Sequence, residues 1–393
     1  MTLAPVAITG MGCICAAGHN LSDSMASLFS GSRAPAPPVN FTSNHPINYP
    51  VFEVQNFTVP ADLLRTSALG LHAAREALAD AGLERQLLDR VRVGVCVGTT
   101  VGCAISNEIF CREYRSVTAP GMAPLERVLR SNPAAVIARE FGFSGPCQTI
   151  VNACSSGTDA VGLAASWIRS GVCDVALAGG ADELGRITYI GFISLLITDE
   201  SPCKPFDINR KGLNLGEAGA MMVLESEQIR AMRKKKARSF VLGFGSACDA
   251  YHLTAPRPDG TGLKHAIAEA LACNNTDPGL IAFVNAHGTG TPDNDRVETR
   301  VLAEVLPGVP FLSTKGYTGH TLGAAGAIEA VFTAACLERG EIPANAGFAT
   351  PDPELGGSPV TANTPFSGTV ALSESLAFGG NNSVIILGTG EKA

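Results

Sequence analysis

Residues 151–160, VNACSSGTDA, decide the fold and supply the first candidate for catalysis. An apolar run typical of a strand, residues 148–153, leads directly to Cys154. Small residues follow it, and the pattern predicts a helix to about Ser170 that Gly171 ends. A cysteine on such a turn has an exposed side chain, and the helix N-terminus favours its thiolate, so we expect the pKa of Cys154 to fall. Alternatively, Cys154 is one more buried cysteine in a cysteine-rich chain.

The chain is long enough for two substructures or one two-lobed unit. It has 393 residues, of which 46 % are hydrophobic and 17 % charged, and a single core usually stops growing at roughly 250–300 residues. Strand-like and helix-like segments alternate, which predicts an α/β class with mostly parallel central strands. Both halves, 1–238 and 239–393, show a similar order of segments. Residues 99–130 look irregular or helical and are candidates for a lid or a partner-facing insertion.

Composition excludes several classes of partner. The net charge is −7, and without a broad basic face we expect no nucleic acid. No run of about 18 apolar residues predicts a membrane span. Paired CxxC motifs are missing, so we expect no metal site, and the cysteines inside apolar runs indicate a reducing, cytoplasmic compartment. Those cysteines are Cys13, Cys15, Cys96, Cys173 and Cys336.

A glycine-rich turn at residues 286–292, AHGTGTP, follows a predicted strand. Glycines let a ligand approach the backbone, and the hydroxyls of Thr289 and Thr291 could hold a polar chain. Placement at a strand end favours a functional His287, the alternative being a histidine bonded to local backbone.

A second turn, residues 313–320, STKGYTGH, carries Lys315 and His320. His320 precedes a helix N-terminus, which disfavours imidazolium and predicts a neutral, hydrogen-bonding ring. A buried Lys315 would need a carboxylate, for which Glu329 and Glu298 are candidates. The alternative is a plain structural ion pair.

A third turn, residues 377–383, AFGGNNS, could supply a backbone N–H and a mobile aromatic gate, Phe378. By itself it is typical of a hairpin. One cysteine with one histidine and an Asp or Asn would suggest a cysteine hydrolase. Two neutral histidines beside a thiolate suit another task, because they can donate hydrogen bonds to a carbonyl as enolate charge develops in decarboxylative carbon–carbon bond formation.

With these motifs in order, the chain resembles the β-ketoacyl-acyl carrier protein synthases, elongating condensing enzymes of the thiolase superfamily. The resemblance spans nearly the whole chain. The matching stretches are residues 6–12, 153–157, 204–207, 215–220, 286–292, 313–315, 318–320, 322–326 and 378–380.

The resemblance implies a thiolase-like fold, two related halves packed as a five-layered αβαβα sandwich, usually in a homodimer. It implies that an acyl carrier protein acylates Cys154, with no cofactor beyond the phosphopantetheine arm of the carrier. The backbone N–H groups of Cys154 and Phe378 would form the oxyanion hole, and Phe378 would gate the acyl pocket. His287 and His320 would hold the malonyl thioester carbonyl. The remaining implied roles are organisation of the site by Lys315 through Glu329, support by Glu298, and substrate binding by Thr289, Thr291, Gly379 and Asn381.

Departures from the family pattern concern the acyl substrate. Asn381 stands where Thr is common and Ala377 where Gly is usual, which would stiffen the gate. Ser-Ser-Gly after Cys154 is more similar to polyketide synthases, and the chain is short between residues 99 and 146. A specialised pathway, polyketide or aryl polyene, therefore competes with fatty-acid synthesis.

Two alternatives concern the type of subunit. A degradative thiolase would want a second catalytic cysteine near the C-terminal glycine turn, but no cysteine follows Cys336. A chain-length factor would lack Cys154, although the enzyme could work in a heterodimer with one. Docking of an acidic carrier protein needs a local basic patch, for which the candidates are Arg65, Arg210, Lys211 and residues 233–236. The alternative for each is ordinary solvated surface charge, which is favoured for residues 233–236 because they only end a helix.

Overall fold

The computed structural model describes residues 2–116 and 120–390. Within them, one sheet of ten strands runs through the molecule in the order β3-β2-β4-β5-β1-β6-β12-β11-β7-β8. Its strands are β1 Val6–Cys15, β2 Val93–Gly98, β3 Cys147–Ile150, β4 Val175–Asp182, β5 Ala218–Glu225, β6 Ser239–Cys248, β7 Ile281–Asn285, β8 Phe311–Leu312, β11 Val370–Ala377 and β12 Asn381–Gly388. A separate pair joins β9, Glu341–Ile342, to β10, Thr364–Pro365.

The two halves of the chain have the same topology. From the contact between β1 and β6, the order outward is β1-β5-β4-β2-β3 in one half and β6-β12-β11-β7-β8 in the other. In each half the first three strands are antiparallel neighbours and the last three are parallel neighbours. The structure thus confirms the two related halves predicted from the order of segments.

The prediction of mostly parallel central strands is wrong. The parallel pairs lie at the two outer ends of the sheet, whereas β5, β1, β6 and β12 at its centre are antiparallel. Residues 378–380 show one reason, since a three-residue turn joins β11 to β12 and such a short connection permits only antiparallel pairing.

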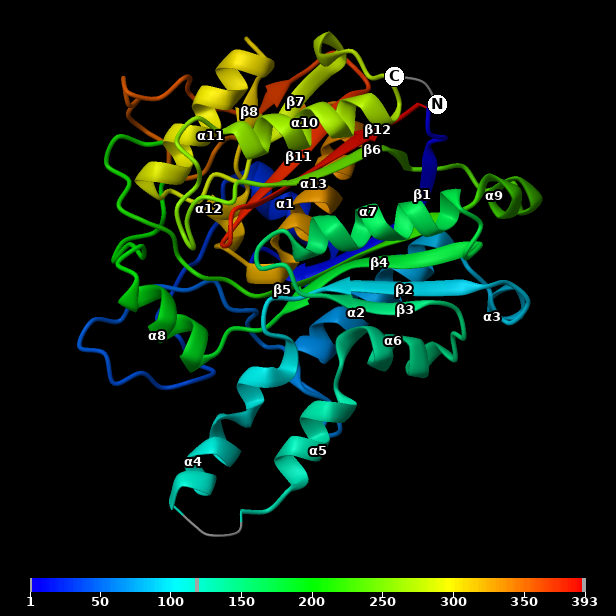
Figure 1. The fold of residues 1–393 in the computed structure, drawn as a ribbon, viewed down its shortest axis with the longest axis horizontal. Helices are drawn as coiled ribbons and strands as arrows, with labels where there is room; N and C mark the ends of the chain where they lie inside the picture. The colour runs from blue at the N-terminus through cyan, green and yellow to red at the C-terminus, as the bar shows by residue number, and fades with distance from the viewer. Residues whose placement is uncertain (1, 117–119, 391–393) are drawn as a thin grey trace.

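Helices cover both halves of the sheet and also separate them, which makes the five layers of the predicted αβαβα sandwich (Figure 1). Helix α10, Thr261–Cys273, packs on β6 and β12, and α11, Pro292–Val305, contacts α10. On the opposite side α2, Arg65–Ala81, packs on β1, β5 and β4, and α6, Pro133–Phe141, packs on β2. The middle layer contains α7, Ser156–Arg169, which contacts β4 and β2, and α13, Ala325–Arg339, which contacts β11 and β5.

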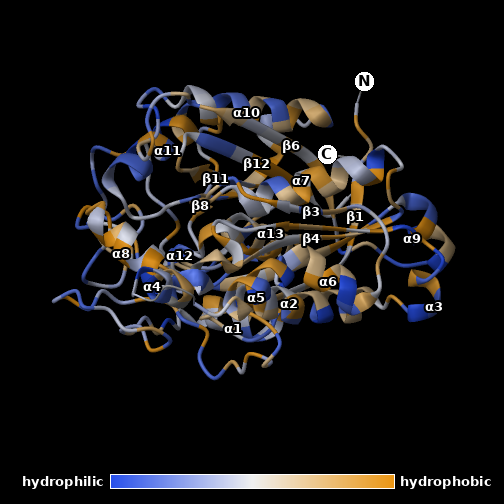
Figure 2. Ribbon diagram, turned by 60° about the horizontal axis from the view of Figure 1, so that its bottom comes forward, coloured by the Kyte–Doolittle hydropathy of each residue, from blue (hydrophilic) through white to orange (hydrophobic). Residues whose placement is uncertain are grey.

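Small residues let the two middle helices touch. A Cβ at Gly157 of α7 would lie 2.7 Å from the backbone nitrogen of Ala327 in α13, closer than atoms can approach. Residues 325–337 of α13 are all buried. Apolar residues concentrate on the central strands and polar ones on the outer helices and loops (Figure 2). The glycines and alanines after residue 153 thus bring the halves together at the candidate nucleophile.

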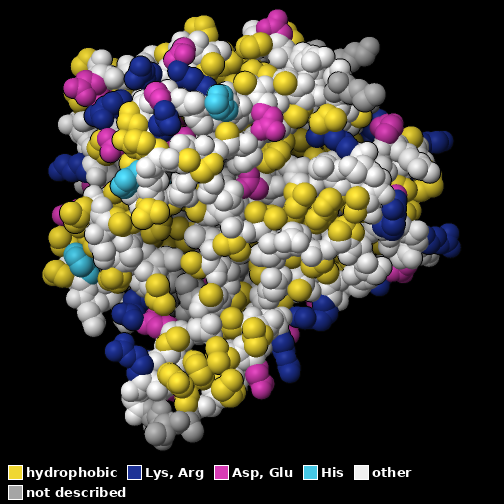
Figure 3. Space-filling model, in the orientation of Figure 1, with side chains coloured by type: hydrophobic (Ala, Val, Ile, Leu, Met, Phe, Trp, Pro, Cys, Tyr) yellow, Lys and Arg dark blue, Asp and Glu magenta, His cyan; other side chains and the backbone are white. Residues whose placement is uncertain are grey.

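Within residues 99–130, the described segments 108–116 and 120–130 form a projection, which agrees with the predicted partner-facing insertion. The helices α4, Glu108–Ser116, and α5, Ala123–Arg130, extend away from the sandwich (Figure 1). Residues 117–119 lie outside the described part. Hydrophobic side chains gather on this projection (Figure 3), and Tyr114, Met122 and Leu129 are exposed.

The remaining helices are short or connect the strands. They are α1 Leu21–Ser30, α3 Arg85–Leu88, α8 Arg186–Ser194, α9 Glu227–Arg233, α12 Lys315–Thr318, and the 3-10 helices Gly102–Asn107, Pro278–Leu280 and Leu322–Ala324. Among the described residues no helix is both long and apolar enough to cross a membrane.

Candidate active site

Cys154 lies on a sharp turn between β3 and α7, as predicted. The residue before it, Ala153, has φ 49°, a left-handed conformation that is unusual for a residue with a Cβ. The hydroxyl of Ser156 accepts a hydrogen bond from the N–H of Asn152 at 2.8 Å and donates to the carbonyl of Ala153 at 2.6 Å. The predicted helix end is also confirmed, because α7 ends at Arg169 and Gly171 has φ 65°.

The predicted fall in the pKa of Cys154 is contradicted. The side chain is buried, with 4 % of the residue exposed, and burial raises the pKa of the thiol to about 11. A hydrogen bond from the backbone N–H of Phe378 to the sulfur and the charge of Lys315 both lower the pKa, but by less than burial raises it. The resting nucleophile is therefore a neutral thiol that must lose its proton as it attacks.

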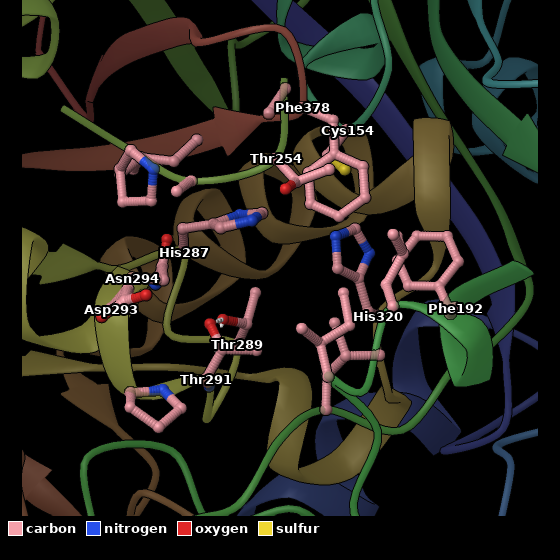
Figure 4. A pocket seen from close by; sticks show the side chains of 18 of the residues that line it. Cys154, Phe192, Thr254, His287, Thr289, Thr291, Asp293, Asn294, His320 and Phe378 are labelled. Atoms are coloured by element: carbon pink, nitrogen blue, oxygen red, sulfur yellow. Dashed lines mark hydrogen bonds between the residues drawn. The ribbon is translucent and has the colours of Figure 1, made fainter. Parts of the chain in front are cut away.

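The two predicted histidines lie side by side in front of the cysteine. His287 follows β7, and His320 follows α12 at the other glycine-rich turn. Their ring centroids are 5.2 Å apart and their planes are at 87°. Both rings point into the cavity that Cys154 borders (Figure 4).

Both histidines are neutral, as predicted for His320. Burial, followed by the charge of Lys315, lowers the pKa of each ring well below its usual value. Nδ1 of His320 accepts the N–H of Leu322 at 3.1 Å, and Nδ1 of His287 lies 3.0 Å from the ammonium of Lys315. A neutral imidazole that accepts at Nδ1 carries its proton on Nε2, so these contacts assign a donor Nε2–H to each ring.

Lys315 forms the buried ion pair that its position required. Its ammonium contacts the carboxylate of Glu329, and both side chains are 1 % exposed. Glu298, the other candidate partner, has a different role: it accepts the backbone N–H groups of His287 and of Gly288, the latter at 2.8 Å. Lys315 therefore contacts the His287 ring, while Glu298 holds the His287 backbone.

The cavity has a volume of about 170 Å³, and six of the predicted residues line it. They are Cys154, His287, Thr289, Thr291, His320 and Phe378. The two threonine hydroxyls are 2.8 Å apart (Figure 4). Gly379 and Asn381, predicted to bind substrate, lie instead in the turn beside the lining: the N–H of Gly379 donates to the carbonyl of Leu253 at 2.8 Å, and the Asn381 amide to that of Phe378 at 3.3 Å.

Sequence reasoning missed Phe192 on α8. Its ring stacks on that of Phe378 with centroids 5.5 Å apart and planes at 15°, and lies 6.4 Å from the ring of His320. Helix α8 has apolar residues on most sides and no N-cap hydrogen bond, so no pattern marked it. Helix α11 was also not predicted from the sequence, although it did have a signal, because Thr291 followed by Pro292 is typical of a helix start.

Three of the seven candidate docking cations lie in internal ion pairs. Arg65 binds Glu217, with 12 % of its side chain exposed, and Arg210 binds Asp352 at 2.6 Å with 4 % exposed. Arg233 binds the buried Glu225. These three side chains are largely buried and paired and cannot form a docking patch, so the prediction is wrong for them, whereas Lys211, Lys234 and Lys236 are exposed.

A buried thiol beneath a backbone N–H, with two neutral histidine donors across one cavity, defines a thiolase-like condensing enzyme. Comparison with known proteins places the chain within that class. The sequence models "Beta-ketoacyl synthase, N-terminal domain" and "Beta-ketoacyl synthase, C-terminal domain" match residues 52–229 and 238–349. The chain belongs to the β-ketoacyl synthase family, which confirms the resemblance, the fold and the condensing reaction predicted from the motifs.

Relatives come from both fatty-acid and polyketide synthesis. The 3-oxoacyl-[acyl-carrier-protein] synthase 2 of Synechocystis is 31 % identical over 96 % of each chain. The tetracenomycin polyketide synthase ketoacyl synthase alpha subunit of Streptomyces glaucescens is 35 % identical over 82 % of this chain and 80 % of its own. The solved structure of the ishigamide ketosynthase/chain length factor matches with a TM-score of 0.94 and 30 % identity, over 99 % of this chain and 100 % of that one.

Proposed function

We propose that this ketosynthase accepts an acyl group from an acyl carrier protein on Cys154 and elongates it with malonyl-acyl carrier protein to a 3-oxoacyl product. The convergence of the Cys154 sulfur and two neutral histidine donors on one cavity carries this proposal. The name of the Synechocystis relative supports the carrier-bound substrate.

In the first half-reaction the sulfur of Cys154 attacks the acyl thioester carbonyl. The new S–C bond replaces the bond to the phosphopantetheine sulfur, which leaves with the thiol proton. Charge on the carbonyl oxygen is stabilised by the backbone N–H groups of Cys154 and Phe378, the latter already hydrogen-bonded to the sulfur. No cofactor enters this step.

In the second half-reaction the malonyl thioester carbonyl accepts the Nε2–H groups of His287 and His320. Its carboxylate leaves as carbon dioxide, and the two donors stabilise the enolate oxygen. The enolate carbon attacks the acyl-Cys154 carbonyl, so a C–C bond forms, the S–C bond breaks, and the thiol is restored with a proton from solvent. Thr289 and Thr291 bind the phosphopantetheine arm along the cavity wall.

Phe378 serves as the gate of the acyl pocket. Its ring is stacked on Phe192 beside Cys154, so an acyl chain that enters from the cavity must displace one of the two rings. Ala377 precedes Phe378 and restricts the backbone more than glycine would.

Two features support a specialised pathway and a two-subunit enzyme over housekeeping fatty-acid synthesis. The ishigamide structure contains a ketosynthase and a chain length factor and aligns with nearly all of this chain. The projection of α4 and α5 exposes Tyr114, Met122 and Leu129, an apolar surface suited to a partner subunit. A homodimer is the alternative.

The thiols packed in the core, such as Cys13 and Cys96, suit a reducing cytoplasm.

The proposal is tested by mass spectrometry of the Cys154 peptide after incubation with a panel of acyl-acyl carrier protein thioesters. We expect the mass of one preferred acyl group on Cys154, with and without a co-expressed chain-length factor. Acylation of the exposed Cys111 or Cys147 in place of Cys154, or of no cysteine, would contradict the assignment.

Substitution of His320 by alanine tests the decarboxylation step. Because one of two donors to the enolate is lost, we expect kcat for malonyl decarboxylation to fall about 100- to 1,000-fold. Carbon dioxide release from malonyl-acyl carrier protein measures it, with His265→Ala on the outer surface of α10 as the matched control. Retained decarboxylation in His320→Ala would remove the proposed role.

A further inference from the structure

Three buried glutamates surround the single ammonium group of Lys315 behind the cavity. Glu298 comes from α11, Glu329 from α13 and Glu374 from the middle of β11, and each is at most 1 % exposed. Lys315 contacts the carboxylate of Glu329. Glu374 is fully buried, and neither of its oxygens has an N–H or O–H donor among the described residues. Its carboxyl group lies within hydrogen-bonding reach of that of Glu298.

Two carboxyl groups in such contact cannot both be ionised away from water, so one of them holds a proton. Hydrogen bonds decide which one. Glu298 accepts two backbone N–H groups and the Asn294 amide at 3.1 Å, which favour its ionised form. Glu374 has no such donor, and burial together with the charges of Glu298 and Glu329 raises its pKa well above the usual value.

The charged groups that face Glu374 are those of the cluster. Glu298 and Glu329 raise its pKa, and Lys315 lowers it by less. The neighbouring strands β7, IAFVN, and β12, NNSVIILG, contain no titratable side chain. The proton therefore stays on Glu374 and is directed at Glu298.

We propose that Glu374 is a positioning residue of the condensing site, a carboxylic acid that donates a hydrogen bond to Glu298 and thereby holds the backbone of His287 and Gly288. This inference rests on the proposed function. Glu374 does not line the cavity and acts through Glu298, which contacts the His287 turn directly. The pair keeps Nε2 of His287 aimed at the place where the malonyl carbonyl binds.

A pH dependence follows from this role. The pair is intact below the pKa of Glu374 and is lost as the pH rises through it, because the second negative charge then repels Glu298. Decarboxylation by the wild type should fall on this alkaline limb. A glutamine in place of Glu374 donates an N–H to Glu298 at every pH, so its alkaline limb should lie at higher pH.

The test compares Glu374→Gln, Glu374→Ala and wild type in malonyl-acyl carrier protein decarboxylation across pH. We expect kcat of the glutamine variant to stay within about threefold of wild type, and that of the alanine variant to fall up to about 100-fold with little change in KM, since a misplaced catalytic group costs that much. Glu183→Gln is the matched control, because Glu183 is a buried acid with a pKa of about 7 outside this cluster. It should leave the pH profile unchanged.

Infrared spectroscopy of the wild type tests the proton directly. At a pH about two units above the pKa of about 7 of Glu183, Asp295 and Glu329, those acids are ionised, and the remaining carboxylic-acid C=O band should disappear in Glu374→Gln. Lack of that band, or a glutamine variant as impaired as alanine with an unshifted alkaline limb, would overturn the inference. A wild type that shows the band but releases no carbon dioxide would contradict the proposed function instead.

Discussion

Replacement of Cys154 by alanine is expected to abolish condensation completely. Among the residues that the structure describes, no other cysteine lines the cavity, so no other thiol there can accept the acyl group where the histidines meet the malonyl thioester. Elongation of an acyl primer by malonyl-acyl carrier protein, followed by mass spectrometry of the carrier-bound product, measures the loss. Cys111→Ala, at an exposed cysteine of α4, is the matched control and should elongate normally.

Cys154→Gln separates the two half-reactions. The glutamine cannot be acylated, but its amide carbonyl can accept the backbone N–H of Phe378 as the acyl-cysteine carbonyl would. We therefore expect this variant to release carbon dioxide from malonyl-acyl carrier protein without forming a 3-oxoacyl product. Elongation by Cys154→Ala at the wild-type rate would refute the assignment of the nucleophile.

The sequence was sufficient to predict those parts of the site whose structure is controlled by a local pattern of residues. The turn at Cys154 was predictable because a strand, a run of small residues and a glycine that ends the helix all lie within about 25 residues of sequence. The turns at His287 and His320 were predictable because each lies in a glycine-rich stretch, and the stretch with His287 directly follows a predicted strand. Their meeting in one cavity was inferred from the family resemblance and not from the local patterns, since it depends on α7 and α13 touching across two halves of the sheet.

The protonation state of Cys154 could not be predicted from its neighbours in sequence. The helix N-terminus is a local feature, but the residues that bury the sulfur come from distant segments. Phe378, whose N–H donates to the sulfur, belongs to the turn after β11, and its ring stacks on Phe192 from a helix without a periodic pattern. Desolvation by such distant residues therefore reverses the direction of the pKa shift expected from the turn itself.

Glu374 escaped prediction for a related reason. Within VALSESLA of β11, three consecutive polar residues, 373–375, interrupt an apolar run, so no alternating pattern marks Glu374. Every residue of β11 is buried, and the strand period of two places Glu374 on the same face as the apolar Leu372 and Leu376. Only the packing shows that Glu374 meets Glu298, which holds the backbone of the His287 turn.

Replacement of Lys315 by alanine is expected to give the largest loss of stability, because it leaves the carboxylates of Glu329 and Glu298 without the cation that faces them. Breaking a buried ion pair in this way costs about 3–5 kcal/mol, measurable by urea unfolding. Condensation should also fall, since Nδ1 of His287 loses the donor that keeps its proton on Nε2. The burial-raised pKa of Glu329, about 7 in the wild type and lowered by Lys315, should rise further in the variant.

The sign of the pH dependence follows from that shift. A carboxyl whose folded-state pKa lies above its unfolded value of about 4.5 destabilises the protein progressively as the pH rises through the interval between them. Wild type and Lys315→Ala lose this stability in parallel up to about pH 7, so the stability gap between them should stay nearly constant below pH 7 and widen as the pH rises above it. The double variant Lys315→Met, Glu329→Leu removes both charges and should recover most of the stability but not the condensing activity. An unfolding midpoint for Lys315→Ala equal to that of wild type, or condensation by the double variant, would show that the ion pair does not organise the site.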